Sequence, residues 1–302
     1  MEKYLAIDLG RTKLRYAVIT DGLDILDQGS EYTDIQNEEQ VFAPIKKIAD
    51  QYRGKVEGLS LTMPGVIDSA NGIAYSGGVY GWVRDYPYAQ KLSEYIGGMP
   101  VVIANDAKAA AMAEIGYGAL KNIQNGVMLL ILNTGIGGAV IHNGKILDGA
   151  HFASGEVSYI RGDYKRRDDY NDMFALACSI DGLSRAVEET SGKANLNILR
   201  IMAKVASGDE AVTKGVENYC DRLALYMYNI QCVIDAEAFV IGGHLTDEPR
   251  TMKMIREAVV RQFGADRYGN VFRPEIKECV FHNNSRMYGA VYNFRLQTGR
   301  LK

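Results

Sequence analysis

Two stretches of the chain, residues 6–27 and 132–148, are built on the same plan. Each runs from an apolar segment through a turn of Gly and Thr into a second apolar segment, then through Asp-Gly or Asn-Gly to the letters Ile-Leu-Asp. The two stretches are offset by roughly 120 residues, about the length of one domain. Because Asp-Gly and Asn-Gly are common hairpin turns, one short match can arise by chance. The match still favours two duplicated domains that face one cleft.

The rest of the chain alternates between strand-like and helix-like patterns. Short apolar runs such as PVVIAN (100–105) and VMLLIL (127–132) predict buried strands. Helical spacing of apolar residues extends over 38–52, 107–120 and 216–234. Hairpins that alternate with helices are typical of an α/β fold with mixed sheets. At 302 residues the chain is long for a single core, so we place a domain boundary near residue 108.

Composition excludes several classes of protein. The 34 basic and 37 acidic side chains give a net charge of -3, which offers no basic field for nucleic acid. The four Cys, at 178, 220, 232 and 279, form no C-x-x-C pair, so neither a zinc site nor a disulfide framework is expected. Asp8 interrupts the first apolar run, and no apolar stretch approaches the roughly 20 residues that span a bilayer. We expect a soluble cytoplasmic protein, with the charged stretch 161–172 as a solvated loop.

The two Gly/Thr turns are candidate phosphate loops. Backbone N–H groups in such turns can donate to phosphate oxygens; the candidates are those of Gly10, Arg11 and Thr12 and of Gly135, Ile136 and Gly137. An ordinary hairpin is the alternative for either loop. Asp8 ends an apolar strand and requires a partner, either a hydrated Mg²⁺ beside phosphate or Lys13. Neither loop matches the P-loop or the Rossmann pattern.

Asp106 lies where the strand 100–105 meets an Ala-rich helix. It can cap that helix, which the local sequence favours, or act as a general base that accepts a hydroxyl proton during attack on a γ-phosphate. Glu156 can accept hydrogen bonds from sugar hydroxyls or face solvent. Trp82 can stack on a sugar or belong to the core.

Six segments occur in the order of the motifs of the ROK family of sugar kinases, which the chain resembles over nearly its whole length. DLGRTK (8–13) is similar to D-x-G-G-T-K, with Arg11 in place of the second Gly. The other segments that resemble family motifs are TMPGVID (62–68), ANDAKAAAMAE (104–114), LNTGIGGAVIHNGKILDG (132–149), ASGEVSY (153–159) and FVIGGHL (239–245).

The resemblance implies a fold and a set of site residues. It implies two actin-like (RNase H-like) domains, 1–107 and 108–286, with a C-terminal helix at about 287–302 that packs back on the first domain. Asp106 would be the catalytic base for the sugar's primary hydroxyl, usually the 6-OH. Sugar binding would fall to Asn105, Glu156, Gly65 and Tyr159. Mg²⁺, through water on Asp8, and ATP would be bound by Asp8, Gly10, Thr12, Lys13, Thr134, Gly135, Gly137, Gly242 and Gly243.

Two departures from the family pattern concern the sugar. The zinc-binding array of many members is missing between 160 and 182, so no zinc is expected. Tyr159 stands where the family has His, and the second sugar-binding Glu falls near Ala175. Loss of two polar groups around the anomeric position weakens recognition of free glucose and admits a substituent there. This pattern is similar to the β-glucoside kinase branch, which phosphorylates disaccharides such as cellobiose.

Other functions within the family stay open. A glucokinase, an N-acetylmannosamine kinase, or a kinase of fructose or allose would share the same motifs. A sugar-sensing repressor would need a helix-turn-helix before Asp8, for which there is no room. A non-catalytic sugar or nucleotide binder is suggested by Arg11 and the missing sugar ligands. Family members are commonly dimers, so the resemblance also implies a homodimer, with neither nucleic acid nor a membrane as partner.

Overall fold

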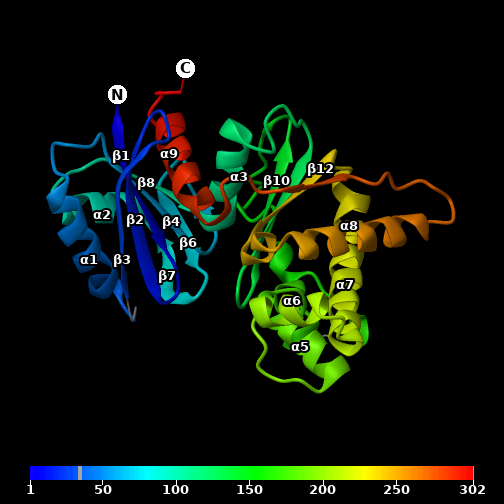
Figure 1. The fold of residues 1–302 in the computed structure, drawn as a ribbon. Coiled ribbons are helices and arrows are strands. Elements are labelled where there is room, and N and C mark those ends of the chain that lie inside the picture. Colours follow the sequence, from blue (N-terminus) through cyan, green and yellow to red (C-terminus); the bar gives the residue numbers. More distant parts are fainter. Residues whose placement is uncertain (33–35, 167, 302) are drawn as a thin grey trace. The chain divides into compact units, whose positions relative to one another are not determined.

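The computed structural model describes residues 1–32, 36–166 and 168–301. The chain divides into two compact units (Figure 1). Unit 1 comprises Met1–Gly118, Asp148–Ser154 and Asn284–Lys302, and unit 2 comprises Ala119–Leu147 and Gly155–Asn283. Within the described residues, no helix is both long enough and apolar enough to cross a membrane.

Unit 1 contains a five-stranded sheet with the order β3-β2-β1-β4-β8. The first three strands form an antiparallel meander, and the last two join in parallel. The bounds are β1 (Lys3–Leu9), β2 (Lys13–Thr20), β3 (Ile25–Tyr32), β4 (Leu59–Met63) and β8 (Val101–Asn105). A small second sheet contains β5 (Ile67–Asp68), β6 (Ile73–Gly77) and β7 (Tyr80–Tyr86). The helices are α1 (Glu38–Gln51), α2 (Tyr88–Tyr95), α3 (Asp106–Tyr117) and α9 (Ser285–Gln297).

Strand β1 is buried on both faces of the unit 1 sheet. Tyr4 and Ala6 pack with the apolar side chains of α9, whereas Leu5 and Ile7 pack with those of α1 and α2. Alternate side chains of a strand point to opposite faces, so a nearly continuous apolar run is what a strand between two helical layers requires. The sheet therefore holds the end of β1, where Asp8 lies, in a fixed position.

Helix α9 returns from the C-terminus and packs along α3 in unit 1. The crossing is very close at Gly289, where a Cβ would lie 1.6 Å from the carbonyl oxygen of Ala109. Because α3 packs on α9, unit 1 continues to Gly118, past the expected boundary at residue 107. The expectation that residues from 108 onward belong to the second domain was wrong for α3.

Unit 2 repeats the strand order of unit 1. Its sheet has the order β11-β10-β9-β12-β13, with antiparallel pairing up to β9 and parallel pairing beyond it. The strands are β9 (Gly126–Ile131), β10 (Ile136–His142), β11 (Lys145–Ile146), β12 (Ala238–Gly243) and β13 (Glu275–Glu278). The common topology confirms the α/β class and agrees with the internal repeat. Each Gly/Thr turn joins the first two strands of its sheet.

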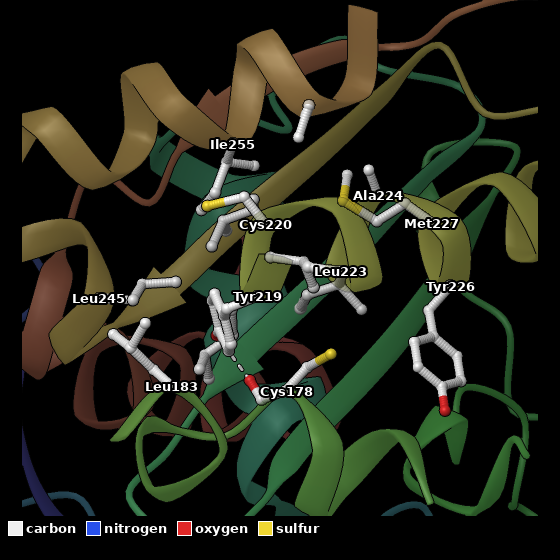
Figure 2. Packing of buried hydrophobic residues seen from close by; sticks show 14 of the residues in the cluster. Cys178, Leu183, Tyr219, Cys220, Leu223, Ala224, Tyr226, Met227, Leu245 and Ile255 are labelled. Carbon is white, nitrogen blue, oxygen red and sulfur yellow. Dashed lines mark hydrogen bonds between the residues drawn. The ribbon is translucent and has the colours of Figure 1, made fainter. Parts of the chain in front are cut away.

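Helices cover the unit 2 sheet. They are α4 (Phe174–Ala177), α5 (Ile180–Ser191), α6 (Ile198–Ala206), α7 (Glu210–Ile234) and α8 (Pro249–Gly264). Short 3-10 helices are η1 (Val157–Tyr159), η2 (Tyr164–Arg166), η3 (Tyr170–Asp172), η4 (His244–Asp247) and, in the joining segment, η5 (His282–Asn284). In the core, Tyr219 of α7 lies among Leu183, Leu223 and Leu245 and donates to the carbonyl of Cys178 at 2.7 Å (Figure 2).

Two predictions about polar and aromatic segments are resolved by the fold. Most described residues of the stretch 161–172 are exposed or half-buried, as expected for a solvated loop, but the buried carboxylate of Asp172 accepts from the amides of Gly162 and Asp163. Residue 167 lies outside the described residues. Trp82 packs against the core of unit 1 beside Tyr88, at 6.3 Å between ring centroids, so the core interpretation holds.

Candidate active site

Asn105, rather than Asp106, caps helix α3. The side-chain oxygen of Asn105 accepts from the amides of Ala107 at 2.9 Å and Lys108 at 3.0 Å. Asp106 is the first residue of the helix, and its Oδ1 accepts from the amide of Ala107 at 2.8 Å. The local interpretation of Asp106 as the cap was therefore wrong. Because Asn105 caps the helix, the carboxylate of Asp106 can still accept a hydrogen bond from a hydroxyl or take up its proton.

The surroundings of Asp106 favour a stronger base than an ordinary aspartate. Burial raises the pKa of its carboxyl, the positive charge of Arg286 lowers it, and the negative charge of Asp8 raises it. The net direction is upward. A carboxylate with a raised pKa holds an accepted proton more firmly, which suits general base catalysis near neutral pH.

Asp8 is held by three donors within unit 1. Arg15 donates to Oδ2 through Nε at 3.1 Å and Nη2 at 2.8 Å. The Thr62 hydroxyl donates to Oδ1 at 3.0 Å, and Arg286 Nη1 lies 3.2 Å from the same oxygen. Asp8 is 2% exposed, so these partners compensate for the loss of water around its charge. The partner proposed from the sequence, Lys13, instead lies over the ring of Tyr32, 5.7 Å from its centroid.

The first Gly/Thr turn is fixed from two sides. The amide of Gly10 donates to the carbonyl of Lys13 at 3.0 Å, and the Tyr80 hydroxyl donates to the carbonyl of Gly10 at 2.8 Å. The Gly10 amide therefore closes the turn and is not available to a ligand, which leaves the amides of Arg11 and Thr12 as candidate donors. Burial, together with the charges of Asp8 and Asp106, raises the pKa of Tyr80, so this phenol stays protonated beside both carboxylates.

The turn at Gly65 supports Asn105. Asn105 Nδ2 donates to the Gly65 carbonyl at 2.9 Å, and Val66 N donates to Ser76 Oγ at 3.1 Å. Gly65 has φ of 109°, and a Cβ there would lie 2.1 Å from the carbonyl oxygen of Ser76. Only glycine fits this position, so the turn sets the orientation of the Asn105 amide.

Lys108 links α3 to the segment Asp148–Ser154. Its buried Nζ lies 2.9 Å from Asp148 Oδ1 and donates to the carbonyl of Phe152 at 3.0 Å. The ring of Phe152 stacks on that of Tyr75, with centroids 5.6 Å apart. These contacts fix the segment on unit 1, beside the helix that begins with Asp106.

The second Gly/Thr turn, in unit 2, is braced by helix α5. Leu132 N donates to the Gly135 carbonyl, and the amides of Ile180 and Asp181 donate to the carbonyls of Leu132 and Asn133 at 3.1 and 2.9 Å. Thr134 is exposed, and Gly135 and Gly137 are half-buried. In the described chain the amides of Thr134 and Gly135 have no partner, which makes them suitable donors for an anion.

The other predicted residues of unit 2 lie at strand and helix ends. Gly242 and Gly243 end β12, and a Cβ on Gly243 would lie 1.9 Å from the Ile131 carbonyl oxygen. Glu156 is half-buried just before η1, and Tyr159 is 66% exposed at its end.

The structure distributes the predicted site residues over the two units. Unit 1 holds Asp8, Gly10, Thr12, Lys13, Gly65, Asn105 and Asp106, and unit 2 holds Thr134, Gly135, Gly137, Glu156, Tyr159, Gly242 and Gly243. Sequence reasoning missed five residues whose side chains make hydrogen bonds or ion pairs around the candidate site in unit 1. They are Arg15, Thr62, Tyr80, Lys108 and Arg286. Among the residues described, no group of three or more His, Cys, Asp and Glu side chains could hold a metal ion.

Comparison with known proteins decides the family. The sequence model of the ROK family matches residues 4–295 of this chain. The chain belongs to the ROK family. A glucokinase from Halalkalibacterium halodurans is 32% identical over 274 residues, which cover 82% of each chain. A β-glucoside kinase from Klebsiella pneumoniae is 26% identical over 297 residues, 97% of this chain and 96% of the relative.

A solved structure agrees with the fold over the whole chain. A ROK family protein from Streptococcus pneumoniae TIGR4, in complex with sucrose, has a TM-score of 0.84 and 25% identity, with 99% of this chain and 100% of that chain covered. With the family and the named kinases, this chain is a ROK sugar kinase and an ATP-dependent carbohydrate kinase.

Proposed function

We propose that the chain transfers the γ-phosphate of ATP to the 6-OH of the glucose unit in a β-glucoside, with Asp106 as the general base. The observation that supports this role is the division of tasks at the start of α3. Asn105 caps the helix, and Asp106 beside it is half-buried with a raised pKa. An aspartate that only stabilised the helix through its dipole would be expected to have a lowered pKa rather than a raised one.

ATP would enter as its Mg²⁺ complex, a substrate of the reaction. The amides of Arg11 and Thr12 in unit 1, and those of Thr134 and Gly135 in unit 2, would donate to phosphate oxygens. Both oxygens of Asp8 already accept from Thr62, Arg15 and Arg286. This arrangement suits contact with the ion through water rather than direct ligation, because direct ligation would displace an arginine.

The β-glucoside is supported by the residues around the anomeric position. Tyr159 stands in place of the family His and is exposed, and Ala175, near which the second sugar-binding Glu of the family falls, is apolar and buried. The relative named β-glucoside kinase covers nearly the whole chain. Glucose itself is the second candidate, since the relative named glucokinase has the higher identity of the two. Asn105, Gly65 and Glu156 would contact the sugar ring in either case.

Two further parts of the proposal concern the state of the protein. A homodimer would cover exposed apolar side chains on unit 2, among them Val233, which is 81% exposed, and Phe272, which is 74% exposed. A kinase that uses ATP would act in the cytoplasm.

Substrate preference can be measured with a panel of sugars. We expect kcat/KM for cellobiose and gentiobiose to exceed that for glucose by about tenfold or more, since the site lacks polar partners for a free anomeric hydroxyl. The measurement is ADP release in a coupled assay with glucose, mannose, N-acetylmannosamine, fructose, allose, cellobiose and gentiobiose. A preference for glucose would overturn the β-glucoside and support the glucokinase alternative.

A further inference from the structure

Arg286 lies close to the two carboxylates of the candidate site. It is the second residue of α9, its Nη1 is 3.2 Å from Asp8 Oδ1, and its charge acts on Asp106. Its neighbours Ser285 and Met287 are 1% and 3% exposed. The close crossing of Gly289 on Ala109 fixes the helix against α3. The backbone of Arg286 is therefore held in place, and its side chain, 19% exposed, reaches into the site.

Asp8 does not depend on Arg286 alone for compensation of its charge. Arg15 stands directly across from Asp8 in the β1–β2 hairpin and donates two hydrogen bonds to Oδ2, and Thr62 donates to Oδ1. No other carboxylate lies within ion-pair distance of Arg286 in the described chain. A guanidinium has five N–H groups, so one contact with Asp8 leaves most of them available to a ligand.

The chemistry of this position points to a phosphoryl group. The planar guanidinium matches two oxygens of a phosphate, and charge-assisted bonds of this kind are the strong ones. In the transfer, negative charge spreads over the three equatorial oxygens of the moving phosphoryl group. A cation placed near both the base and the carboxylate of the phosphate loop is located where that charge develops.

We propose that Arg286 binds the phosphoryl group during its transfer from ATP to the sugar and stabilises its charge. This proposal rests on the proposed function. The sugar oxygen forms a bond to the γ-phosphorus while the bond from that phosphorus to the bridging oxygen breaks. The electron pair of the broken bond leaves with ADP, and the hydroxyl proton moves to the carboxylate of Asp106. Arg286 donates hydrogen bonds throughout and exchanges neither a proton nor a covalent bond.

Arg286→Met and Arg286→Lys test the proposal. Methionine keeps much of the length of the side chain and removes its charge. Lysine keeps the charge but lacks the planar guanidinium that can bind two phosphate oxygens at once. We expect Arg286→Met to lower kcat with cellobiose by about 10²- to 10³-fold, with the KM for cellobiose changed less than about threefold. Arg286→Lys should retain an intermediate kcat, and free guanidinium ion should restore part of the turnover of Arg286→Met.

The dissociation constants of ATP and ADP, each measured with Mg²⁺ by titration calorimetry, give a readout that does not depend on the sugar. We expect Arg286→Met to weaken ATP binding by about tenfold or more and to leave ADP binding unchanged, because only ATP carries the γ-phosphate. Arg256→Met is the matched control, since Arg256 forms an ion pair with Glu278 in unit 2, with side chains 45% and 39% exposed.

The outcomes separate this proposal from the proposed function. A kcat of Arg286→Met within about threefold of the wild type, or equal weakening of ATP and ADP binding, would overturn the role of Arg286. Absence of sugar phosphorylation by the wild type would overturn the proposed function, while the ATP-to-ADP affinity ratio would still test Arg286. Should Arg286→Met lower the melting temperature, Arg286→Lys and the guanidinium rescue carry the test.

Discussion

Asp106→Asn is expected to lower kcat by about 10²- to 10⁴-fold, the range that a positioned general base contributes. Asparagine keeps the shape of the side chain and an oxygen that can accept from the amide of Ala107, but it cannot accept the sugar's proton. ATP affinity should stay within about threefold of the wild type. The measurement is turnover at saturating ATP and sugar, together with the Kd for ATP.

The fold should survive this substitution. Asn105 remains as the cap of α3. Replacement of this half-buried carboxylate, whose pKa is raised, by a neutral amide removes a charge that loss of solvent disfavours. The melting temperature should be unchanged or slightly higher. Asp221→Asn, at an exposed ion pair with Arg261, is the matched control and should keep full turnover. Near-normal turnover of Asp106→Asn would remove Asp106 from the mechanism.

Gly289→Ala is expected to destabilise unit 1 by about 3 kcal/mol, at the upper end of overpacking costs. The added Cβ would lie 1.6 Å from the Ala109 carbonyl oxygen, so α3 and α9 must move apart. The displacement would move Asp106 at the start of α3 and Arg286 at the start of α9, so kcat should fall as well. Urea unfolding and turnover measure the two effects.

Gly264→Ala provides the control for this prediction. Gly264 is the last residue of α8, and nothing lies within 4 Å of a Cβ built there. That substitution should be neutral or stabilise by about 0.4–1 kcal/mol, because alanine restricts the unfolded chain. If Gly289→Ala were as stable as the wild type, the close crossing of α3 and α9 would not be required for the stability of unit 1.

Some of the site could be predicted from the sequence because it depends on local pattern. The strand runs, the Ala-rich helix and the repeated turn determine where Asp8 and Asp106 stand, at the end and the beginning of elements. The pairing of Asp8 with Arg15 was within reach as well, since a tight turn over residues 10–13 places them opposite each other in the hairpin. We named Lys13 only as the alternative to a hydrated Mg²⁺, and Lys13 lies over Tyr32.

The rest depends on contacts that spacing does not reveal. Arg286 reaches Asp8 only because α9 returns from the C-terminus to pack on α3, and Thr62 reaches Asp8 because β4 pairs with β1 in a particular register. The capping of α3 by Asn105 rather than Asp106 is a difference of one residue at a helix boundary, where the first hydrogen bonds rather than the residue types decide which residue is the cap.

The central claim is that Asp106 accepts the proton of the sugar hydroxyl. The pH dependence of kcat/KM is its most direct test. The groups that influence it are Arg286, which lowers the pKa of Asp106, and Asp8, which raises it, beside the protonated Tyr80. Protonation disables the base, so activity should fall as the pH decreases through a single ionisation above the ordinary aspartate range. The residual activity of Asp106→Asn should lack this ionisation. An unchanged acid limb in Asp106→Asn would contradict the claim.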